Sequence, residues 1–131
     1  MKIVYVTGCL GFIGAYVTRA CLQKGWMVYG IDKCTYACSR ELLNEFRAYD
    51  NFAFEQIDIC KMTHLYDCDY VINTAAESHV GNSIIKSDDF INSNIVGVKN
   101  LLDLIRLKPT NVNSRPVFFH FSTDEVYGDI N

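Results

Sequence analysis

The sequence predicts an α/β fold built on a doubly wound parallel sheet of five strands, with helices on both faces. Short apolar runs alternate with stretches of helical period, and no repeat or low-complexity linker interrupts them. The apolar runs contain few polar residues, which predicts strands buried on both faces. A glycine-rich turn joins the first run directly to the first helical stretch.

The expected strands are short segments rich in Val, Ile, Phe and Tyr. We place them at residues 2–7, 27–31, 52–57, 70–74 and 117–122.

Three helices are expected between these strands. The first spans residues 11–24, with Gly25 as the stop signal after it, and the second spans residues 40–49. The third spans residues 87–107, with acidic residues in its first turn and Pro109 beyond its end. Its apolar stripe is wide enough for two partners, its own sheet and a second helix such as one from another subunit. A helix that is simply well buried would show the same pattern.

The composition suits one globular domain with its own core. The chain has 131 residues, half of them hydrophobic, and a net charge of -3. Basic and acidic residues are spread without runs, so we expect neither nucleic acid nor a membrane surface as a partner. The chain enters a strand at once, without the apolar segment of a secretory signal, and no apolar stretch is long enough to cross a bilayer. These features predict a cytoplasmic protein.

The six cysteines are expected to be free thiols, most of them small buried hydrophobes, because the cytosol is reducing. Cys34 and Cys38 have the spacing of half a metal site, but no second Cys or His pair follows at a matching distance. No metal is therefore expected.

The glycines between the first strand and the first helix have the context of a dinucleotide-binding turn. Gly8 would permit the tight turn, Gly11 would let the backbone approach a pyrophosphate, and Gly14 would let the helix pack closely. The helix N-terminus would then receive the anion. Asp32 closes the second strand and could accept both hydroxyls of an adenosine ribose, which favours NAD over NADP. The alternative is an ordinary turn and an ordinary strand end.

Polar residues follow the other strands as well. Asp58 and Ile59 could contact an adenine ring, and Ala75 and Ala76 would leave room for a cofactor. His79 alone would be unremarkable. The acidic pair at residues 124–125 follows the last strand, where the ligands of an open parallel sheet bind, although such a pair is often only a polar turn.

Together these residues resemble the extended short-chain dehydrogenase/reductase family and, within it, the nucleotide-sugar 4,6-dehydratases, especially those that act on dTDP-glucose. Residues 7–14 resemble a fingerprint that epimerases and decarboxylases of the family share. Residues 32–37, 75–80 and 93–97 are more selective. Residues 122–128, Ser-Thr-Asp-Glu-Val-Tyr-Gly, are the most selective, because epimerases generally lack the adjacent Asp and Glu.

The resemblance implies a Rossmann-type domain and an NAD-dependent dehydration of a nucleotide-activated hexose. Hydride would leave C4, water would be eliminated across C5 and C6, and hydride would return to C6. Thr123 would hydrogen-bond the sugar O4, with Asp124 as general acid and Glu125 as general base. Burial and neighbouring groups would have to keep Asp124 protonated and Glu125 ionised. Ser78 and His79 would also contact the nucleotide-sugar substrate.

The residues expected to bind NAD lie in the glycine loop, at the strand ends and on the long helix. They are Gly8, Gly11, Phe12, Ile13, Gly14, Asp32, Lys33, Cys34, Thr35, Asp58, Ile59, Thr74, Ala75, Ala76, Ser78 and Ser93.

The chain departs from the family pattern at several points. Gly81-Asn82 stands where an Asp-Arg pair is usual, and Cys38 replaces a usual glycine, which matters only if that backbone needs a positive φ. The family's Tyr-x-x-x-Lys motif and its substrate domain are absent, and Tyr127 is not the tyrosine of that motif. We therefore expect an N-terminal fragment, nearly inactive by itself, of an enzyme that is a homodimer at full length.

Three alternatives stay open at this point. A nucleotide-sugar epimerase or decarboxylase would share the NAD site but would not need both carboxylates. A self-standing NAD-binding module would have no catalysis. A purely structural domain would make the glycine loop and Asp32 a coincidence.

Overall fold

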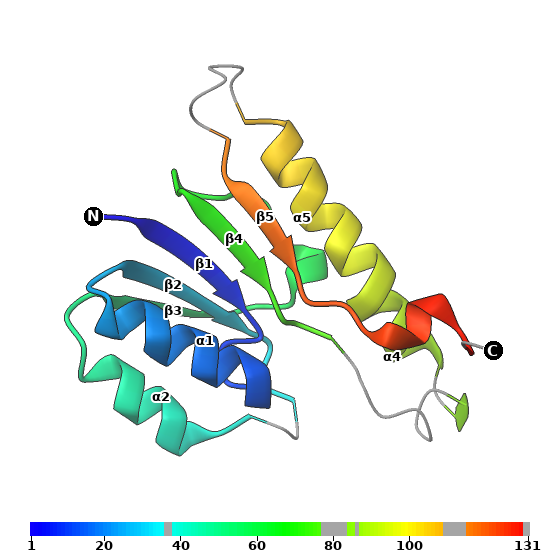
Figure 1. Ribbon diagram of the computed structural model, residues 1–131, viewed down its shortest axis with the longest axis horizontal. Helices are drawn as coiled ribbons and strands as arrows, with labels where there is room; N and C mark the ends of the chain where they lie inside the picture. Colours follow the sequence, from blue (N-terminus) through cyan, green and yellow to red (C-terminus); the bar gives the residue numbers. More distant parts are fainter. Residues whose placement is uncertain (36–37, 77–83, 86, 109–114, 130–131) are drawn as a thin grey trace.

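The computed structural model describes residues 1–35, 38–76, 84–85, 87–108 and 115–129, and it confirms the parallel sheet. Among these residues the sheet has five strands, all parallel, in the order β3-β2-β1-β4-β5 (Figure 1). Every strand begins and ends within two residues of its predicted position. The strands are β1 (Ile3–Thr7), β2 (Met27–Asp32), β3 (Phe52–Gln56), β4 (Tyr70–Asn73) and β5 (Val117–His120).

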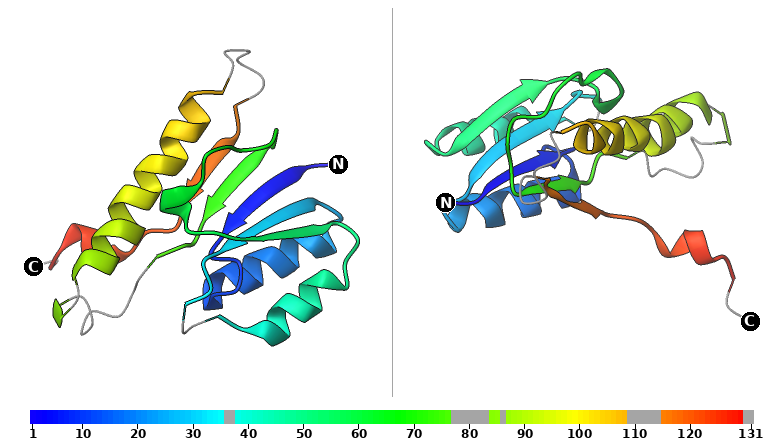
Figure 2. Two further views of the ribbon diagram at one scale, coloured as in Figure 1. Left: turned by 180° about the vertical axis from the view of Figure 1, so that it is seen from behind. Right: turned by 90° about the horizontal axis from the view of Figure 1, so that it is seen from above.

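Helices lie on both faces of the sheet, as predicted. The helices α1 (Phe12–Gln23) and α2 (Arg40–Arg47) cover one face, and α5 (Gly97–Arg106) crosses the other (Figures 1 and 2). Two short 3-10 turns, η1 (Ile59–Lys61) and η3 (Asp124–Tyr127), were not predicted. None of the helices in the described part of the chain is long and apolar enough to cross a membrane.

The core consists of two apolar layers, one on each side of the sheet. Alternate strand residues point to opposite faces, so Val4 and Val6 of β1 pack toward α1 and α2. Tyr5, between them, packs toward Leu101 of α5 instead. The central strand is therefore buried on both faces, as its unbroken apolarity predicted.

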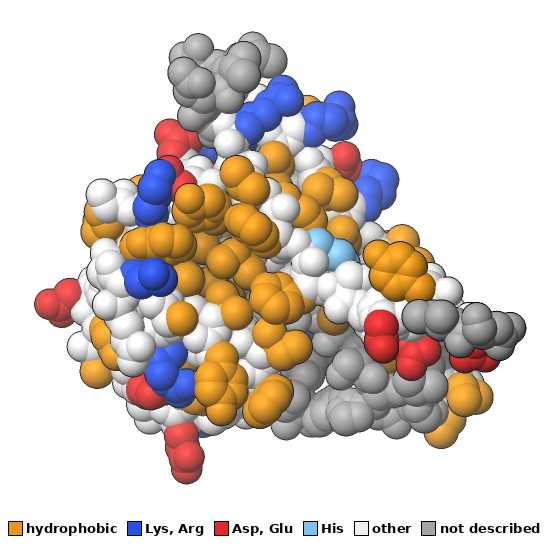
Figure 3. All heavy atoms as spheres, viewed as in Figure 1, with side chains coloured by type: hydrophobic (Ala, Val, Ile, Leu, Met, Phe, Trp, Pro, Cys, Tyr) orange, Lys and Arg blue, Asp and Glu red, His pale blue; other side chains and the backbone are white. Residues whose placement is uncertain are grey.

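The expectation of burial on both faces is wrong for β5. This strand lies at the edge of the sheet, and neither α1 nor α2 reaches it. Val117, Phe119 and Phe121 are about half exposed. Figure 3 shows that hydrophobic side chains gather over this side of the sheet. The strand therefore exposes apolar surface on the face that α1 and α2 leave open.

The long helical segment is continuous but is not one α-helix. It consists of α4 (Ser87–Ile91), the π-helical turn η2 (Asn92–Val96) and α5. Gly97 follows the π turn and lies in close contact with Ile59 of η1. A Cβ added at position 97 would overlap the Ile59 side chain. The face that carries Leu101 is buried, whereas Ile95 and Leu102 are exposed. The exposed stripe fits the second helical partner expected from the sequence, which stays a prediction.

Candidate functional site

The glycine loop leaves the N-terminus of α1 open to an anion. Gly8 has a φ of +67°, and its amide donates to the carbonyl of Ile31, which fixes the loop against β2 (2.7 Å). Gly11 is the N-cap residue, and no side chain caps the helix. The amide groups of the first turn are therefore available to a phosphate group.

Gly14 in α1 lies in close contact with the glycine loop and with the residue after β4. An added Cβ would overlap the carbonyl oxygen of Gly8 and would lie 2.7 Å from the hydroxyl oxygen of Thr74. That hydroxyl donates to the carbonyl of Thr7 (2.6 Å), so the end of β4 is joined to the end of β1. A residue with a side chain at position 14 would push apart the three segments that form the site.

Asp32 connects the end of β2 to the glycine loop. One carboxylate oxygen accepts a hydrogen bond from the amide of Leu10 (3.1 Å), and the other accepts one from the amide of Cys34 (2.8 Å). Cys34 has a φ of +58°, which is uncommon for a residue with a side chain. Cys38 does not have a positive φ, so this chain tolerates a side chain there without backbone strain.

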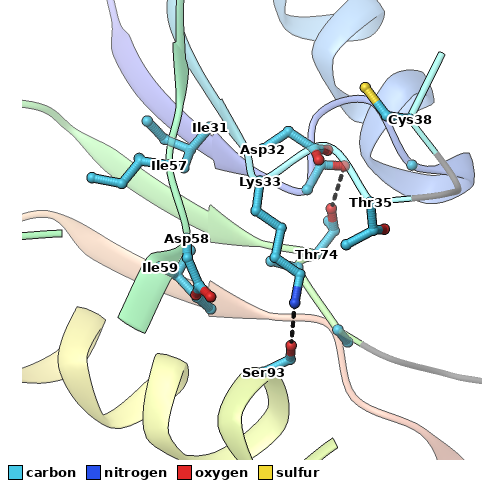
Figure 4. Close-up of a pocket in the computed structure, with 14 residues that line it drawn as sticks. Ile31, Asp32, Lys33, Thr35, Cys38, Ile57, Asp58, Ile59, Thr74 and Ser93 are labelled. Atoms are coloured by element: carbon cyan, nitrogen blue, oxygen red, sulfur yellow. Dashed lines mark hydrogen bonds between the residues drawn. The ribbon is translucent and has the colours of Figure 1, made fainter. Parts of the chain in front are cut away.

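A pocket opens at the carboxyl edge of the sheet, where the ends of β1, β2, β3 and β4 meet the π turn. It encloses about 110 Å³ (Figure 4). Its lining residues are Gly8, Gly11, Ile31, Asp32, Lys33, Thr35, Cys38, Ile57, Asp58, Ile59, Thr74, Ala75, Ala76 and Ser93.

Lys33 and Ser93 join the two sides of this pocket. The ammonium group of Lys33 donates to the hydroxyl of Ser93 across 3.3 Å (Figure 4). Ser93 lies in the π turn and is 6% exposed. Such turns are frequent at functional sites because they shift a side chain out of the regular helical pattern. Here the turn brings a residue of the long helix to the mouth of the pocket.

The floor of the pocket is held by the turn η1. One carboxylate oxygen of Asp58 accepts the amide of Cys60 (2.9 Å), which starts the turn. The side-chain amide of Asn100 in α5 donates to the carbonyl groups of Ile59 (2.7 Å) and Met62 (2.9 Å). These bonds fix Asp58 and Ile59 at the tip of β3.

Beneath the glycine loop, Cys9 is completely buried, and burial raises the pKa of its thiol. It therefore stays a neutral, apolar group, as expected for a buried cysteine. The six cysteines are free thiols, but the expectation that most of them are buried is wrong, because only Cys9 and Cys21 are buried and the other four are partly exposed. In the described part of the chain, no three His, Cys, Asp or Glu side chains are grouped as metal ligands.

Most residues expected at the cofactor site lie around this pocket, but not all. Phe12, Ile13, Gly14 and Cys34 do not line it, and the side chain of Phe12 is 82% exposed. Ser78 and His79 lie outside the described residues. Cys38 also lines the pocket, although the sequence marked it only as the replacement of a usual glycine. Ile31 and Ile57 line the pocket but were not singled out from the sequence. No local signal distinguishes them from other strand-end residues.

The expected catalytic residues are not part of the pocket. Thr123, Asp124 and Glu125 are all exposed, and none of them lines it. Thr123 caps η3, since its hydroxyl oxygen accepts the amide of Glu125 (3.3 Å). In Figures 1 and 2 this turn extends beyond the sheet, away from the glycine loop. The burial that would separate the protonation of the two carboxylates is absent in the structure.

The fold and the pocket define a class of protein: a Rossmann-type domain with a glycine loop at the N-terminus of its first helix and an acidic residue after its second strand. The family follows from the sequence. The sequence model described as GDP-mannose 4,6 dehydratase matches residues 5–131, and the chain belongs to this family of nucleotide-sugar dehydratases.

Individual proteins support the same assignment. The chain is 42% identical to a dTDP-glucose 4,6-dehydratase from Neisseria meningitidis over 141 aligned positions, which cover 99% of this chain and 40% of that protein. The chain thus spans about two fifths of the length of this curated relative.

Solved structures include two activities. A double mutant of the dTDP-glucose 4,6-dehydratase from Streptomyces venezuelae, with NAD bound, is 29% identical, with a TM-score of 0.80 over 100% of this chain and 42% of that one. A UDP-N-acetylglucosamine 4-epimerase from Methanobrevibacter ruminantium is 30% identical, with a TM-score of 0.82 over 98% of this chain and 40% of that one. The fold is therefore shared by dehydratases and epimerases.

Proposed function

We propose that this chain binds NAD and supplies the cofactor-binding part of a nucleotide-sugar 4,6-dehydratase of the dTDP-glucose type. One observation carries the proposal: the Asp32 carboxylate is hydrogen-bonded to the glycine loop, and both line the pocket at the open N-terminus of α1. The solved dehydratase with bound NAD is similar to the whole of this chain, over 42% of its own length, which supports the same cofactor.

The residues present fit the two ends of the adenosine diphosphate part. The free amide groups after Gly11 would hold the pyrophosphate, because the helix dipole favours negative charge there. Asp32 already accepts two backbone amides, and each of its oxygens has a further lone pair for a ribose hydroxyl. Asp58 and Ile59 would contact the adenine. A 2′-phosphate would meet the Asp32 carboxylate, so NAD would bind better than NADP.

When bound, NAD would take up a hydride from C4 of the sugar and return it to C6. Glu125 would remove the C5 proton, Asp124 would protonate the departing hydroxyl, and Thr123 would hydrogen-bond O4. These roles rest on the family motif at residues 122–128. They require the segment after β5 to lie against the end of β4, near Ala75 and Ala76, when the sugar is bound.

The test of cofactor binding is calorimetric titration with NAD of the wild-type chain and of Asp32→Asn. The amide side chain has one acceptor oxygen instead of two, so an amide of the loop or a ribose hydroxyl loses its partner. We expect NAD affinity to fall by about ten- to a hundredfold. The preference for NAD over NADP should fall as well, because the repelling charge is gone.

Asp50→Asn is the matched control, since Asp50 is exposed and does not line the pocket. It makes the same change of charge and should leave NAD affinity within twofold of the wild type. An absence of heat and of thermal stabilisation with millimolar NAD would refute the binding proposal.

A second candidate function is a nucleotide-binding module without catalysis. The exposure of Asp124 and Glu125, away from the pocket, is the observation that favours it. An epimerase is also compatible with the fold, but the adjacent acidic pair favours the dehydratase.

A further inference from the structure

The connection between β3 and β4 leaves part of the sheet uncovered. These strands are separated by β2 and β1 in the sheet, and such a crossover between parallel strands usually contains a helix. Here residues 57–69 contain only the 3-10 turn η1, and residues 62–69 have no helix. Met62, Leu65 and Cys68 of this connection fill the core beside α5. On this face of the sheet, the connection covers β2 and β3 less than it covers the part beside α5.

A cavity of about 510 Å³ lies on that uncovered face, within the size range of small-molecule sites. Tyr5, Tyr29 and Ala53 are neighbours across β1, β2 and β3, and they form its floor. The connection between β3 and β4 supplies His64 and Tyr66 as a wall. Ile31 is the one residue that also lines the pocket at the glycine loop.

The cavity is rich in aromatic rings held in contact with one another. The rings of Tyr5 and Tyr29 are stacked with centroids 5.0 Å apart, and those of Tyr29 and Tyr66 are 5.5 Å apart. His64 meets Tyr66 edge to face at 5.1 Å. The Tyr66 amide donates to the hydroxyl of Tyr5 (3.0 Å), which fixes the wall against the floor. The rings are thus positioned before any ligand arrives.

The charge of the cavity selects the kind of ligand. The faces of tyrosine rings carry partial negative charge, and Glu55 adds a carboxylate beside Ile31. Of the described residues that line the cavity, none is a lysine or an arginine. Burial raises the pKa of Tyr5 to about 12, so its ring stays a neutral phenol. An anion would be repelled, and a single carboxylate among apolar rings is a poor site for a hydrated metal ion.

We infer that this cavity binds a small quaternary ammonium cation, with its methyl groups against the rings of Tyr29 and Tyr66 and its charge beside Glu55. Such a cation is weakly hydrated and polarises aromatic faces, so rings and one carboxylate suffice to bind it. The inference is independent of NAD binding, because the two cavities lie at different places on the sheet and share only Ile31.

The test compares choline with its neutral isostere 3,3-dimethylbutan-1-ol, at constant ionic strength and about pH 8, where an ordinary imidazole is uncharged. Calorimetry and amide chemical shifts would follow both titrations. We expect choline to bind with millimolar affinity or better and to shift the amides of residues 64–66. The neutral compound should bind at least tenfold more weakly, since only the charge differs.

Variants locate the site. Tyr66→Leu and Glu55→Gln should each weaken choline binding at least fivefold, whereas Tyr66→Phe, which keeps the ring, should bind within twofold of the wild type. Tyr66 is 55% exposed, so these changes spare the core. Tyr16→Leu, on the opposite side of the sheet in α1 and 63% exposed, is the control and should change nothing. No saturation by tens of millimolar choline, equal binding of the neutral compound, or equal loss in Tyr16→Leu would each overturn the inference.

Discussion

Replacing Gly14 with alanine is expected to distort the glycine loop and to abolish NAD binding. The added methyl group would overlap the carbonyl oxygen of Gly8, a backbone atom, and would press on the Thr74 hydroxyl. Gly8 cannot move away easily. Its amide donates a hydrogen bond to the carbonyl of Ile31, and its backbone is packed closely against Ala75, since even a Cβ on Gly8 would lie only 2.8 Å from the Ala75 amide nitrogen. Relief requires α1 to separate from the ends of β1 and β4.

The expected cost of this overpacking is roughly 2 to 3 kcal/mol of unfolding free energy. For a domain of this size that lowers the melting temperature by roughly 10 °C, which circular dichroism would detect. Affinity for NAD should fall more than a hundredfold, since the amide groups that would hold the pyrophosphate are displaced.

Gly11→Ala is the control for stability. Gly11 has a φ of -78°, and its added Cβ would lie 3.3 Å from the same carbonyl oxygen, so a small adjustment can accommodate it. Its melting temperature should stay within about 3 °C of the wild type. A Gly14→Ala protein that melted like the wild type and bound NAD as well would show that the close approach has no role.

Replacing Glu125 with glutamine is expected to remove the proposed dehydratase activity, assayed in a protein of the curated relatives' full length. The amide cannot accept the C5 proton, and the loss of a general base costs about a hundredfold to ten thousandfold in rate. Exchange of the C5 hydrogen in deuterated water, followed by mass spectrometry with dTDP-glucose as substrate, measures this step directly. Hydride removal from C4 should still be detectable as NADH absorbance, because it precedes the proton transfer.

Asp129→Asn is the matched control, because Asp129 lies in the same exposed segment and loses the same charge. It should keep C5 exchange within twofold. Undiminished exchange in Glu125→Gln would remove the proposed base. A protein with 4-epimerase turnover that neither variant changes would be an epimerase, and binding of NAD without any turnover would identify the non-catalytic module.

The contrast between these two predictions reflects how the chain is built. Gly14 lies among segments that hydrogen bonds already join, so its effect can be measured on the chain alone. Glu125 lies on an exposed turn after an edge strand, and its role depends on where that turn lies when substrate is bound.

The sequence by itself determined the parallel sheet, the positions of its strands to within two residues, and the conformation of the glycine loop. These features are local, because side-chain period sets each strand and a tight turn with positive φ at Gly8 selects glycine. The position of Asp32 beside that loop also followed, since it ends the strand next to the first one.

Only the tertiary structure decided which surfaces are covered. The π turn that brings Ser93 to the pocket and the separation of Asp124 and Glu125 from the pocket depend on how segments far apart in the chain are placed. The same holds for the aromatic cavity, where Tyr66 lies against Tyr5 across 61 positions of sequence. Local patterns encode how a segment folds, whereas packing between distant segments determines what its side chains can reach.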